Sequence, residues 1–567
     1  MKLYKYLLVV LASFSSGMFA QPVVDENKGL VIIVTGGGEV SYEKTKKIAT
    51  EPDFTDTVKV DFTLDYSSID KKLNSKFELE TVKPPKLLII EPLNEIHKGQ
   101  VKLGLNDFKT PPYFDFNYST IRHKKYNAGI VMNHYSSDLD LKGKDDTRFT
   151  ENNIGLYGKK INKKTTLSAD LDYDYNTFRY YGYDPSLFIL DPEDNQQYYS
   201  VLNGGVFLKS NKDKNTKHEY TAGVNYQQLF SKHQVQEHLI ELQGEVNGYY
   251  LPSGGVMDSI DFTDVSGFWN LDVNAGYLIS QDSVLNLSST LVALRPTYKL
   301  KRKSISVTIG LPSYFLTNNS RFLTVLPTLN VEYAIAKDIL IAYAGYDRKY
   351  ERNHYLTYMK ANPFIGGNMP HNNTYTRVDL VGGLKGAFTS KTTFNLGGHY
   401  RDMKGFVLYV NEFTSIGNRK FNVITDDVKH AQAFAEVIFE NKKLNTGLLA
   451  EYNKYEMTSK FAYHLPEIVA QAFVKYNVQD KFYIGTELFY YGEQFALDNN
   501  DALLGTTSDD PITLKAIIDF NFSIDYKYND KLGAFLSVNN ILSTKHQRWN
   551  QYPNYGINVL GGVSYKF

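Results

Sequence analysis

Acidic side chains two residues apart are the groups of this sequence best placed to do chemistry. Asp170, Asp172 and Asp174 alternate with apolar residues, and further charged residues occupy similar positions: Arg377, Asp379, Asp519 and Asp525. Neighbouring carboxylates could act as general acid and general base toward a substrate. In the wall of a membrane barrel, however, such charges more often face the lumen or pair across strands. The choice depends on the elements that carry them.

No motif for other chemistry accompanies these residues. The chain contains no Cys, which excludes disulfides, thiol catalysis and Cys-ligated zinc or iron–sulfur centres. Its 12 His form no His-Glu-x-x-His, and the glycines 36–38 lack the Lys-Ser/Thr of a phosphate loop. Residues 498–501 could offer oxygen ligands to calcium, but we favour a solvated acidic loop. Without a Gly-x-Ser-x-Gly setting either, the sequence predicts no enzyme, no cofactor and no bound metal.

Charge and the first residues indicate where the chain works. Lys and Arg total 62 against 62 Asp and Glu, so no basic excess predicts a nucleic-acid partner. Lys2 and Lys5, the apolar stretch 7–14 and the small residues before Gln21 are typical of a secretory signal peptide over 1–20. No later segment has 18 consecutive apolar residues. The mature chain is therefore soluble outside the cytoplasm, or it crosses a membrane as a closed β-barrel.

One repeated pattern over 99–567 decides between these alternatives. From Ile518 to Tyr528, for example, apolar residues alternate strictly with polar ones, so one face of the strand is apolar and the other hydrophilic. About 22 such runs follow one another, with boundaries uncertain by roughly two to four residues. We therefore predict an all-β fold, a transmembrane antiparallel β-barrel of about 22 strands in the outer membrane, with a short periplasmic N-terminal segment over 21–98.

The connections support an antiparallel barrel with both ends on one side. Short turns, such as 162–164 and 529–531, alternate with long loops at 351–373, 411–428 and 493–512. Short turns belong in the periplasm and long loops outside. One stretch, 249–267, is long where the count expects a short turn, so a strand pair could have been missed there.

The last strand carries a signal of its own. Its residues alternate, the chain stops on an aromatic residue, and one face collects Tyr555, Ile557, Val559, Val563, Tyr565 and Phe567. An apolar last strand that ends in Phe resembles the signal by which the barrel-assembly machinery recognises its substrates. The alternative is an ordinary edge strand. The 44 Tyr also suit the aromatic girdles of a barrel that contacts outer-membrane lipid and lipopolysaccharide.

These features together resemble the barrel of TonB-dependent receptors of the Bacteroidetes type. The resemblance rests on the strand number, the stretch 536–542, Trp549, Tyr552-Pro553 and the terminal Phe567. The stretch from Glu91 to Pro112 is similar to the start of the barrel in a plug-poor branch of that group. The resemblance implies transport of a solute, but residues 21–98 are shorter than the plug domain of such receptors.

The N-terminal segment leaves the function open. Residues 30–36 are similar to the box through which receptors contact TonB, although a plain apolar strand has the same composition. A lumen of this width needs a filling, and we expect residues 21–98 and the long outer loops to supply it, or else a partner protein. We favour a barrel that passes or receives a solute across the outer membrane. A structural or accessory barrel in a larger outer-membrane complex is the alternative.

Overall fold

The computed structural model describes residues 97–567 apart from 107–112, 122, 139–140, 187, 213–217, 251–264, 284–285, 318–322, 338, 413–419, 459 and 498–510. The predicted signal peptide, the segment 21–96, the box at 30–36, the glycines 36–38 and the acidic stretch 498–501 lie outside the described residues. None of the described helices is long and apolar enough to cross a membrane.

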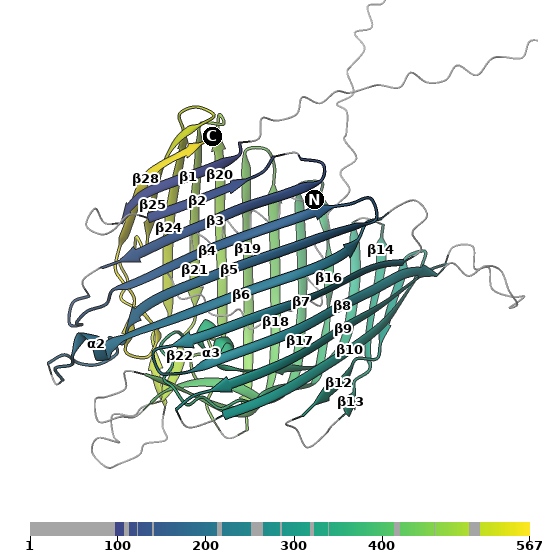
Figure 1. The fold of residues 1–567 in the computed structure, drawn as a ribbon, viewed down its shortest axis with the longest axis horizontal. Coiled ribbons are helices and arrows are strands. Elements are labelled where there is room, and N and C mark those ends of the chain that lie inside the picture. Colours follow the sequence, from purple (N-terminus) through teal and green to yellow (C-terminus); the bar gives the residue numbers. More distant parts are fainter. Residues whose placement is uncertain are drawn as a thin grey trace, which may run out of the picture. The chain divides into compact units, whose positions relative to one another are not determined.

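Twenty-two strands form the wall of a closed antiparallel barrel, as predicted (Figure 1). They are β1 (Gly99–Asn106), β2 (Tyr113–Ser119), β3 (Tyr126–Ser137), β4 (Phe149–Ile161), β5 (Thr165–Arg179), β6 (Gln196–Ser210), β7 (His218–Ser231), β8 (Gln236–Tyr250), β9 (Val265–Gln281), β10 (Asn286–Arg302), β11 (Ile305–Gly310), β14 (Thr328–Ala336), β15 (Leu340–Arg352), β16 (Asn373–Thr389), β17 (Thr392–Asn411), β18 (Phe421–Glu440), β19 (Leu444–Met457), β20 (Ile468–Val478), β21 (Phe482–Tyr491), β24 (Ile517–Lys527), β25 (Leu532–Asn539) and β28 (Asn558–Lys566).

Six shorter strands and two helices complete the described residues. Strands β12 (Ser313–Leu316) and β13 (Leu323–Val325) extend β11 and β14 beyond the prolines at 312 and 327. Because Pro has no N–H to donate, it interrupts the ladder there without ending the hairpin. The loops hold two small hairpins and two helices: β22 (Gln494–Leu497) with β23 (Pro511–Leu514), β26 (Gln547–Trp549) with β27 (Tyr552–Pro553), α2 (Pro192–Asn195) and α3 (Tyr355–Ala361).

The seam between β1 and β28 closes the wall. Residues 100–106 of β1 pair antiparallel with residues 560–566 of β28. The N–H groups of Lys98 and Gly99 donate to the carbonyl of Phe567 at 2.7 and 3.1 Å. A Cβ atom at position 99 would lie 2.6 Å from Cζ of Phe567, so glycine leaves the space that the terminal ring needs. Because no strand edge is left unpaired at the seam, the backbone N–H and C=O groups of each wall strand can pair with the two strands beside it.

The two faces of the wall differ as the alternation predicts. On β5, Leu167, Leu171 and Tyr173 are exposed on the outside, while Asp172 and Asp174 turn inward. The outer surface is therefore apolar and the inner surface polar, which suits lipid outside and water inside.

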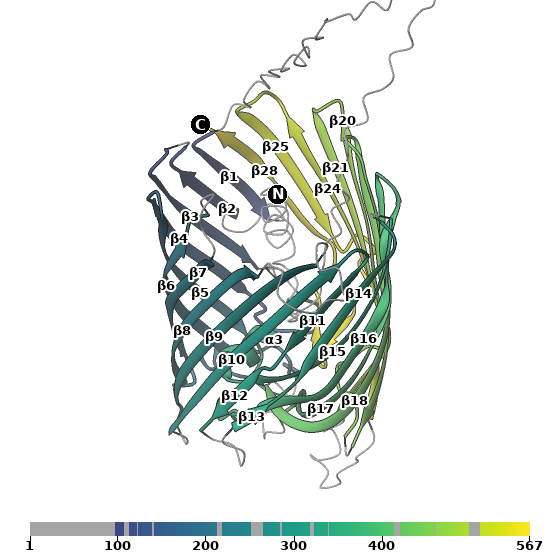
Figure 2. The ribbon, with the colours of Figure 1, turned by 90° about the vertical axis from the view of Figure 1, so that its right-hand side faces the viewer.

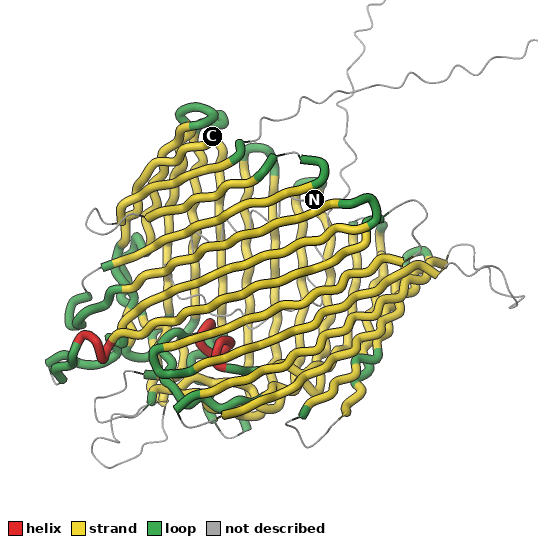
Figure 3. Tube along the Cα trace, in the orientation of Figure 1, coloured by secondary structure: helices red, strands yellow, loops and turns green. Residues whose placement is uncertain are grey.

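The two ends of the barrel differ in their connections (Figures 1 and 3). Gly99, Phe567 and short turns such as 162–164 lie at one end, here called the terminal end; the longer loops lie at the other, the loop end. Strands β8 and β9 pair directly along their length, so no strand pair is missing between them. The connection between them, 251–264, lies outside the described residues.

Candidate functional site

Residues 353–372, here called the cap, fold into the mouth at the loop end. The cap joins β15 to β16 and contains α3, which lies inside the outline of the barrel in both views (Figures 1 and 2). His354 precedes the helix in extended conformation, and its N–H donates to Oγ1 of Thr357 at 2.9 Å. The helix ends before Pro363, since the residue before a proline avoids helical geometry.

A buried carboxylate of the wall holds the first turn of α3. Glu237, on β8, is 3% exposed and accepts hydrogen bonds from the N–H groups of Tyr355 and Leu356 at 2.8 and 3.1 Å. Nδ1 of His354 lies 2.7 Å from Oε2 of Glu237, and the hydroxyl of Ser280 donates to Oε1 of Glu237 at 3.1 Å. The first N–H groups of a helix have no partner within it, so Glu237 satisfies them.

Tyrosine hydroxyl groups satisfy the carbonyls of the cap. Tyr199, on β6, donates to the carbonyl of Pro363 at 3.0 Å. Tyr180, in the loop after β5, donates to the carbonyl of Ile365 at 2.8 Å. Within the cap, Tyr355 donates to Gly366 at 2.9 Å and Tyr358 to Pro370 at 2.7 Å. Burial raises the pKa of both Tyr355 and Tyr358, which keeps them protonated as donors.

The cap also reaches the opposite wall. The N–H of Gly366 donates to the carbonyl of Phe421 at 2.9 Å, and the N–H of Phe421 donates to the carbonyl of Phe364 at 2.9 Å. The ring of Phe364 stacks on Tyr552 with 3.7 Å between centroids. One apolar core thus contains residues of β5 to β7, of the cap, of β18 and of the loop 540–557. Since β5 and β18 lie far apart around the wall, the cap spans the mouth.

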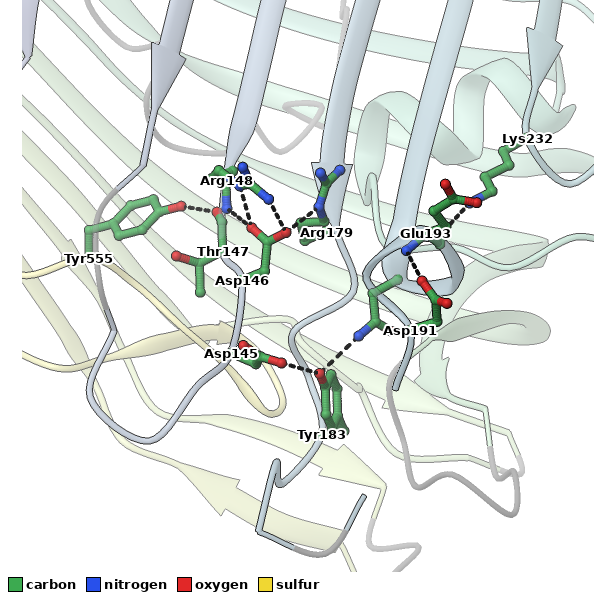
Figure 4. A network of polar contacts seen from close by, with 11 residues as sticks. Asp145, Asp146, Thr147, Arg148, Arg179, Tyr183, Asp191, Glu193, Lys232 and Tyr555 are labelled. Carbon is green, nitrogen blue, oxygen red and sulfur yellow. Dashed lines mark hydrogen bonds and ion pairs between the residues drawn. The ribbon is translucent and has the colours of Figure 1, made fainter. Parts of the chain in front are cut away.

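A polar network braces the rim beside the cap (Figure 4). The carboxylate of Asp146 pairs with the guanidinium groups of Arg148 and Arg179, each at 2.8 Å. Burial alone would raise the pKa of Asp146, but hydrogen bonds from both arginines hold it well below its usual range. The hydroxyl of Tyr555 donates to the carbonyl of Thr147. Residues 146–148 are therefore fixed both to β5 and to the last long loop.

His464 fixes a further loop. It is 1% exposed; its Nδ1 lies 3.0 Å from the carbonyl of Tyr409, and its Nε2 accepts from the N–H of Asn550 at 3.2 Å. Both contacts together require the neutral ring with the proton on Nδ1. Burial lowers the pKa of His464 to about 3, so protonation of this ring opposes the closed arrangement of the loops.

We expect the loop cluster around His464 to lose stability as pH falls below about 6.5, the ordinary pKa of an unfolded His. Because the folded pKa is lower than the unfolded one, the opened state binds more protons, and the loss is about 2 kcal/mol at pH 5. The measurement is the urea midpoint of Trp549 fluorescence, whose ring lies 5.1 Å from that of His464. His464→Gln keeps a donor and an acceptor and should remove most of the pH dependence; an unchanged dependence contradicts the assignment.

The structure places the predicted acidic residues in separate parts of the inner wall. Asp172 and Asp174 line a cavity of about 420 Å³ beneath α3, whereas Asp170 is not among its lining residues. Asp519 is fully buried on β24 opposite Phe489 of β21. Asp525 lies further along β24, opposite Phe535 of β25. The strands therefore bring only Asp172 and Asp174 to a shared space.

Arg377 and Asp379 pair with neighbouring strands. The guanidinium of Arg377 contacts the carboxylate of Asp402 on β17. Asp379 lies 3.1 Å from Nδ1 of His399 and 3.5 Å from Nε of Arg401. These charges compensate one another within the wall. Among the described residues, no group of three or more His, Asp or Glu is placed to hold a metal ion.

The residues predicted as an assembly signal do not all share one face. Ile557, Val563, Tyr565 and Phe567 are exposed on the outside of the barrel, and Val559 is half-buried on the same strand face. Tyr555 differs, because it precedes β28 and packs on Phe149 with 6.0 Å between ring centroids. It belongs to the rim of the loop end, and the role of the others in assembly stays a prediction.

No protein-family model and no curated protein sequence matches the chain. Solved structures do share its fold. The siderophore receptor PirA from Acinetobacter baumannii superposes with a TM-score of 0.63 at 11% identity, over 84% of this chain and 81% of that one. The FrpB iron transporter from Neisseria meningitidis gives 0.61 at 10%, over 84% and 82%. P. aeruginosa FpvA bound to heterologous pyoverdines gives 0.60 at 10%, over 83% and 72%.

The chain therefore has the barrel fold seen in these siderophore receptors and iron transporters. That confirms the predicted resemblance to receptor barrels at the level of the fold. The Bacteroidetes type and the reduced plug stay predictions.

Proposed function

We propose that this chain is an outer-membrane barrel that receives a solute at its loop end and passes it inward, with the cap as its gate. The observation that carries the proposal is the apolar core through which the cap joins opposite walls above a polar lumen. A barrel that only supports a larger assembly has no need for a mouth closed by an anchored loop above a polar cavity. The barrel fold of the solved siderophore receptors and iron transporters supports the same choice.

The proposal fixes the orientation. Residues 1–20 direct export, the barrel-assembly machinery inserts the chain, and the apolar outer wall contacts lipid and lipopolysaccharide. The loop end then faces the outside of the cell and the terminal end faces the periplasm. Residues 21–98 lie in the periplasm, where TonB is the partner that would supply energy. The carboxylates of the wall bind and orient a solute or compensate one another, and they catalyse no reaction.

A second candidate is the accessory barrel. The rim network around Asp146 and Tyr555 favours it, because it fixes loops that a passing solute would have to displace. In that case the closed mouth would be a platform for a partner protein.

Planar-bilayer recordings of the full-length chain separate the two candidates. A transport barrel is expected to show stepwise conductance, with openings that become more frequent at pH 5, where protonation of His464 loosens the loops. A barrel that stays electrically silent at both pH values, and that co-purifies with a fixed partner in constant ratio, would support the accessory role and overturn the proposal.

A further inference from the structure

The cavity beneath α3 has the size of a small-molecule site. It measures about 420 Å³ and lies between the inner faces of β4 to β7 and the lower side of the cap. Pockets for small ligands commonly fall between about 300 and 1,000 Å³. A solute that passes the cap would therefore meet this space in the part of the lumen next to the loop end.

The charges around the cavity favour a cation. Glu151, Asp172 and Asp174 line it, against a single cationic side chain, that of Lys360 on α3. Lys360 is exposed and makes no ion pair within 4.0 Å to a described residue. Asp174 accepts a hydrogen bond from the amide of Asn153 at 2.7 Å, which fixes the carboxylate in place. The acidic side chains of the lining thus outnumber its one basic side chain, and Asp172 and Asp174 face the same space.

The remaining lining suits an organic molecule rather than a bare metal ion. Phe178 and Tyr199 form one side of the cavity, with 5.4 Å between their ring centroids, and Met359 of the cap adds an apolar contact. Aromatic faces attract ammonium groups and also cover the carbon chain of a ligand. The amide side chains of the lining can bond to further polar groups of such a ligand.

We propose that this cavity binds a small organic cation with at least one ammonium group. The inference rests on the proposed function, because it names the class of solute that the gated lumen takes. In the solute-free state Lys360 is the one basic side chain that lines the cavity with Asp172 and Asp174, and we treat it as an internal cation. An incoming ammonium group displaces it and pairs with Asp172 and Asp174, while the carbon chain lies against Phe178 and Tyr199.

The test measures binding of putrescine to the purified full-length chain by equilibrium dialysis. 1,4-Butanediol has the same length and no charge, so it serves as the ligand control. Putrescine is expected to bind saturably, and butanediol at least about tenfold more weakly, a factor that one lost charge contact can supply. Lys360→Met removes the internal cation and should tighten putrescine binding by about three- to tenfold.

The double variant Asp172→Asn, Asp174→Asn should weaken putrescine binding by at least about tenfold. Asp170→Asn is the matched control. Asp170 lies on the same face of β5, two residues before Asp172, and it does not line the cavity. It should leave the affinity within about twofold. The heat-dependent electrophoretic shift of a folded barrel checks that each variant is intact.

Equal affinity for putrescine and butanediol, or weaker binding after Lys360→Met, would overturn the inference even if the double variant failed to fold. Those results would leave the proposed function standing if the chain still conducted in bilayers. A silent barrel that nevertheless bound putrescine with the expected variant pattern would instead contradict transport and support the cation site alone.

Discussion

Replacing residues 353–372 by Asn-Gly should open the mouth of the barrel. Arg352 and Asn373 face each other as the last pair of β15 and β16, so a two-residue turn can join them without changing the register. The replacement removes α3 and the residues that link β5 to β18 through the apolar core. Everything below the cap should then become accessible from the loop end, while the wall keeps its pairing.

Cysteine labelling measures this opening, because the chain has no Cys of its own. Asn203→Cys places a single thiol in the cavity below the cap. Its reaction with a membrane-impermeant maleimide on intact cells should be at least about 100-fold faster in the shortened chain, since local opening of a packed element costs about 3 kcal/mol. Bilayer conductance should rise in the same variant.

Lys142→Cys is the control for this experiment. Residue 142 is exposed in a loop at the loop end, so its labelling rate should be equal in both chains. Rapid labelling of position 203 under an intact cap would show that the cap is no barrier. A thiol that stayed protected after the replacement would show that another part of the chain closes the lumen.

The sequence predicted the wall well because each strand carries its own signal. Alternation along β5 and β24 needs no knowledge of the partner strand, since lipid outside and water inside act on every residue separately. The sixteenth predicted strand was expected to start near residue 429, after the loop 411–428. The observed strand, β18, starts earlier, at Phe421, because its first residues pack against the cap and break the simple alternation. The breaks at Pro312 and Pro327 were also missed, although proline within an alternating run was a visible signal.

The cap could be predicted only in part. A long loop that folds over the lumen was expected, and the apolar residues of 355–365 were the signal that could have singled out this one. The residues that hold the cap could not be predicted from the sequence. Glu237 and His354 are 117 residues apart, and only the closed barrel brings them together. Tyr555 was placed on one face with the other residues of the last strand because the period of that strand was extended beyond its observed start at Asn558. The period of two applies only while the chain stays in the wall.

Glu237→Ala should release the first turn of α3 and destabilise the cap by about 3 kcal/mol. The change removes the acceptor for the N–H groups of Tyr355 and Leu356 and leaves His354 buried without its partner. Apolar packing of the cap remains, so the barrel wall should keep its stability. The loss should therefore appear as an early transition confined to the loop end.

Trp549 reports that transition. The chain has two Trp, and Trp269→Phe leaves Trp549, which lies in the apolar core with the cap. In this background the urea midpoint of Trp549 fluorescence should fall for Glu237→Ala, and by less for Glu237→Gln, whose amide oxygen still accepts a backbone N–H. Glu241→Ala is the matched control, as Glu241 lies on the same face of β8 and makes no contact with the N–H groups of α3.

An equal fall of the urea midpoint for Glu237→Ala and Glu241→Ala would mean that loss of any carboxylate on β8 destabilises the loop end. Glu237 would then make no specific contribution to the stability of α3. A shift confined to Glu237 has a wider consequence. The cap would then depend on one carboxylate of the wall, so any solute or partner that competes for the first turn of α3 could open the mouth by drawing this helix away from Glu237. The apolar core would still hold the cap, but the closed state would lose the about 3 kcal/mol that Glu237 contributes, so a ligand with a smaller preference for the open state could then open it.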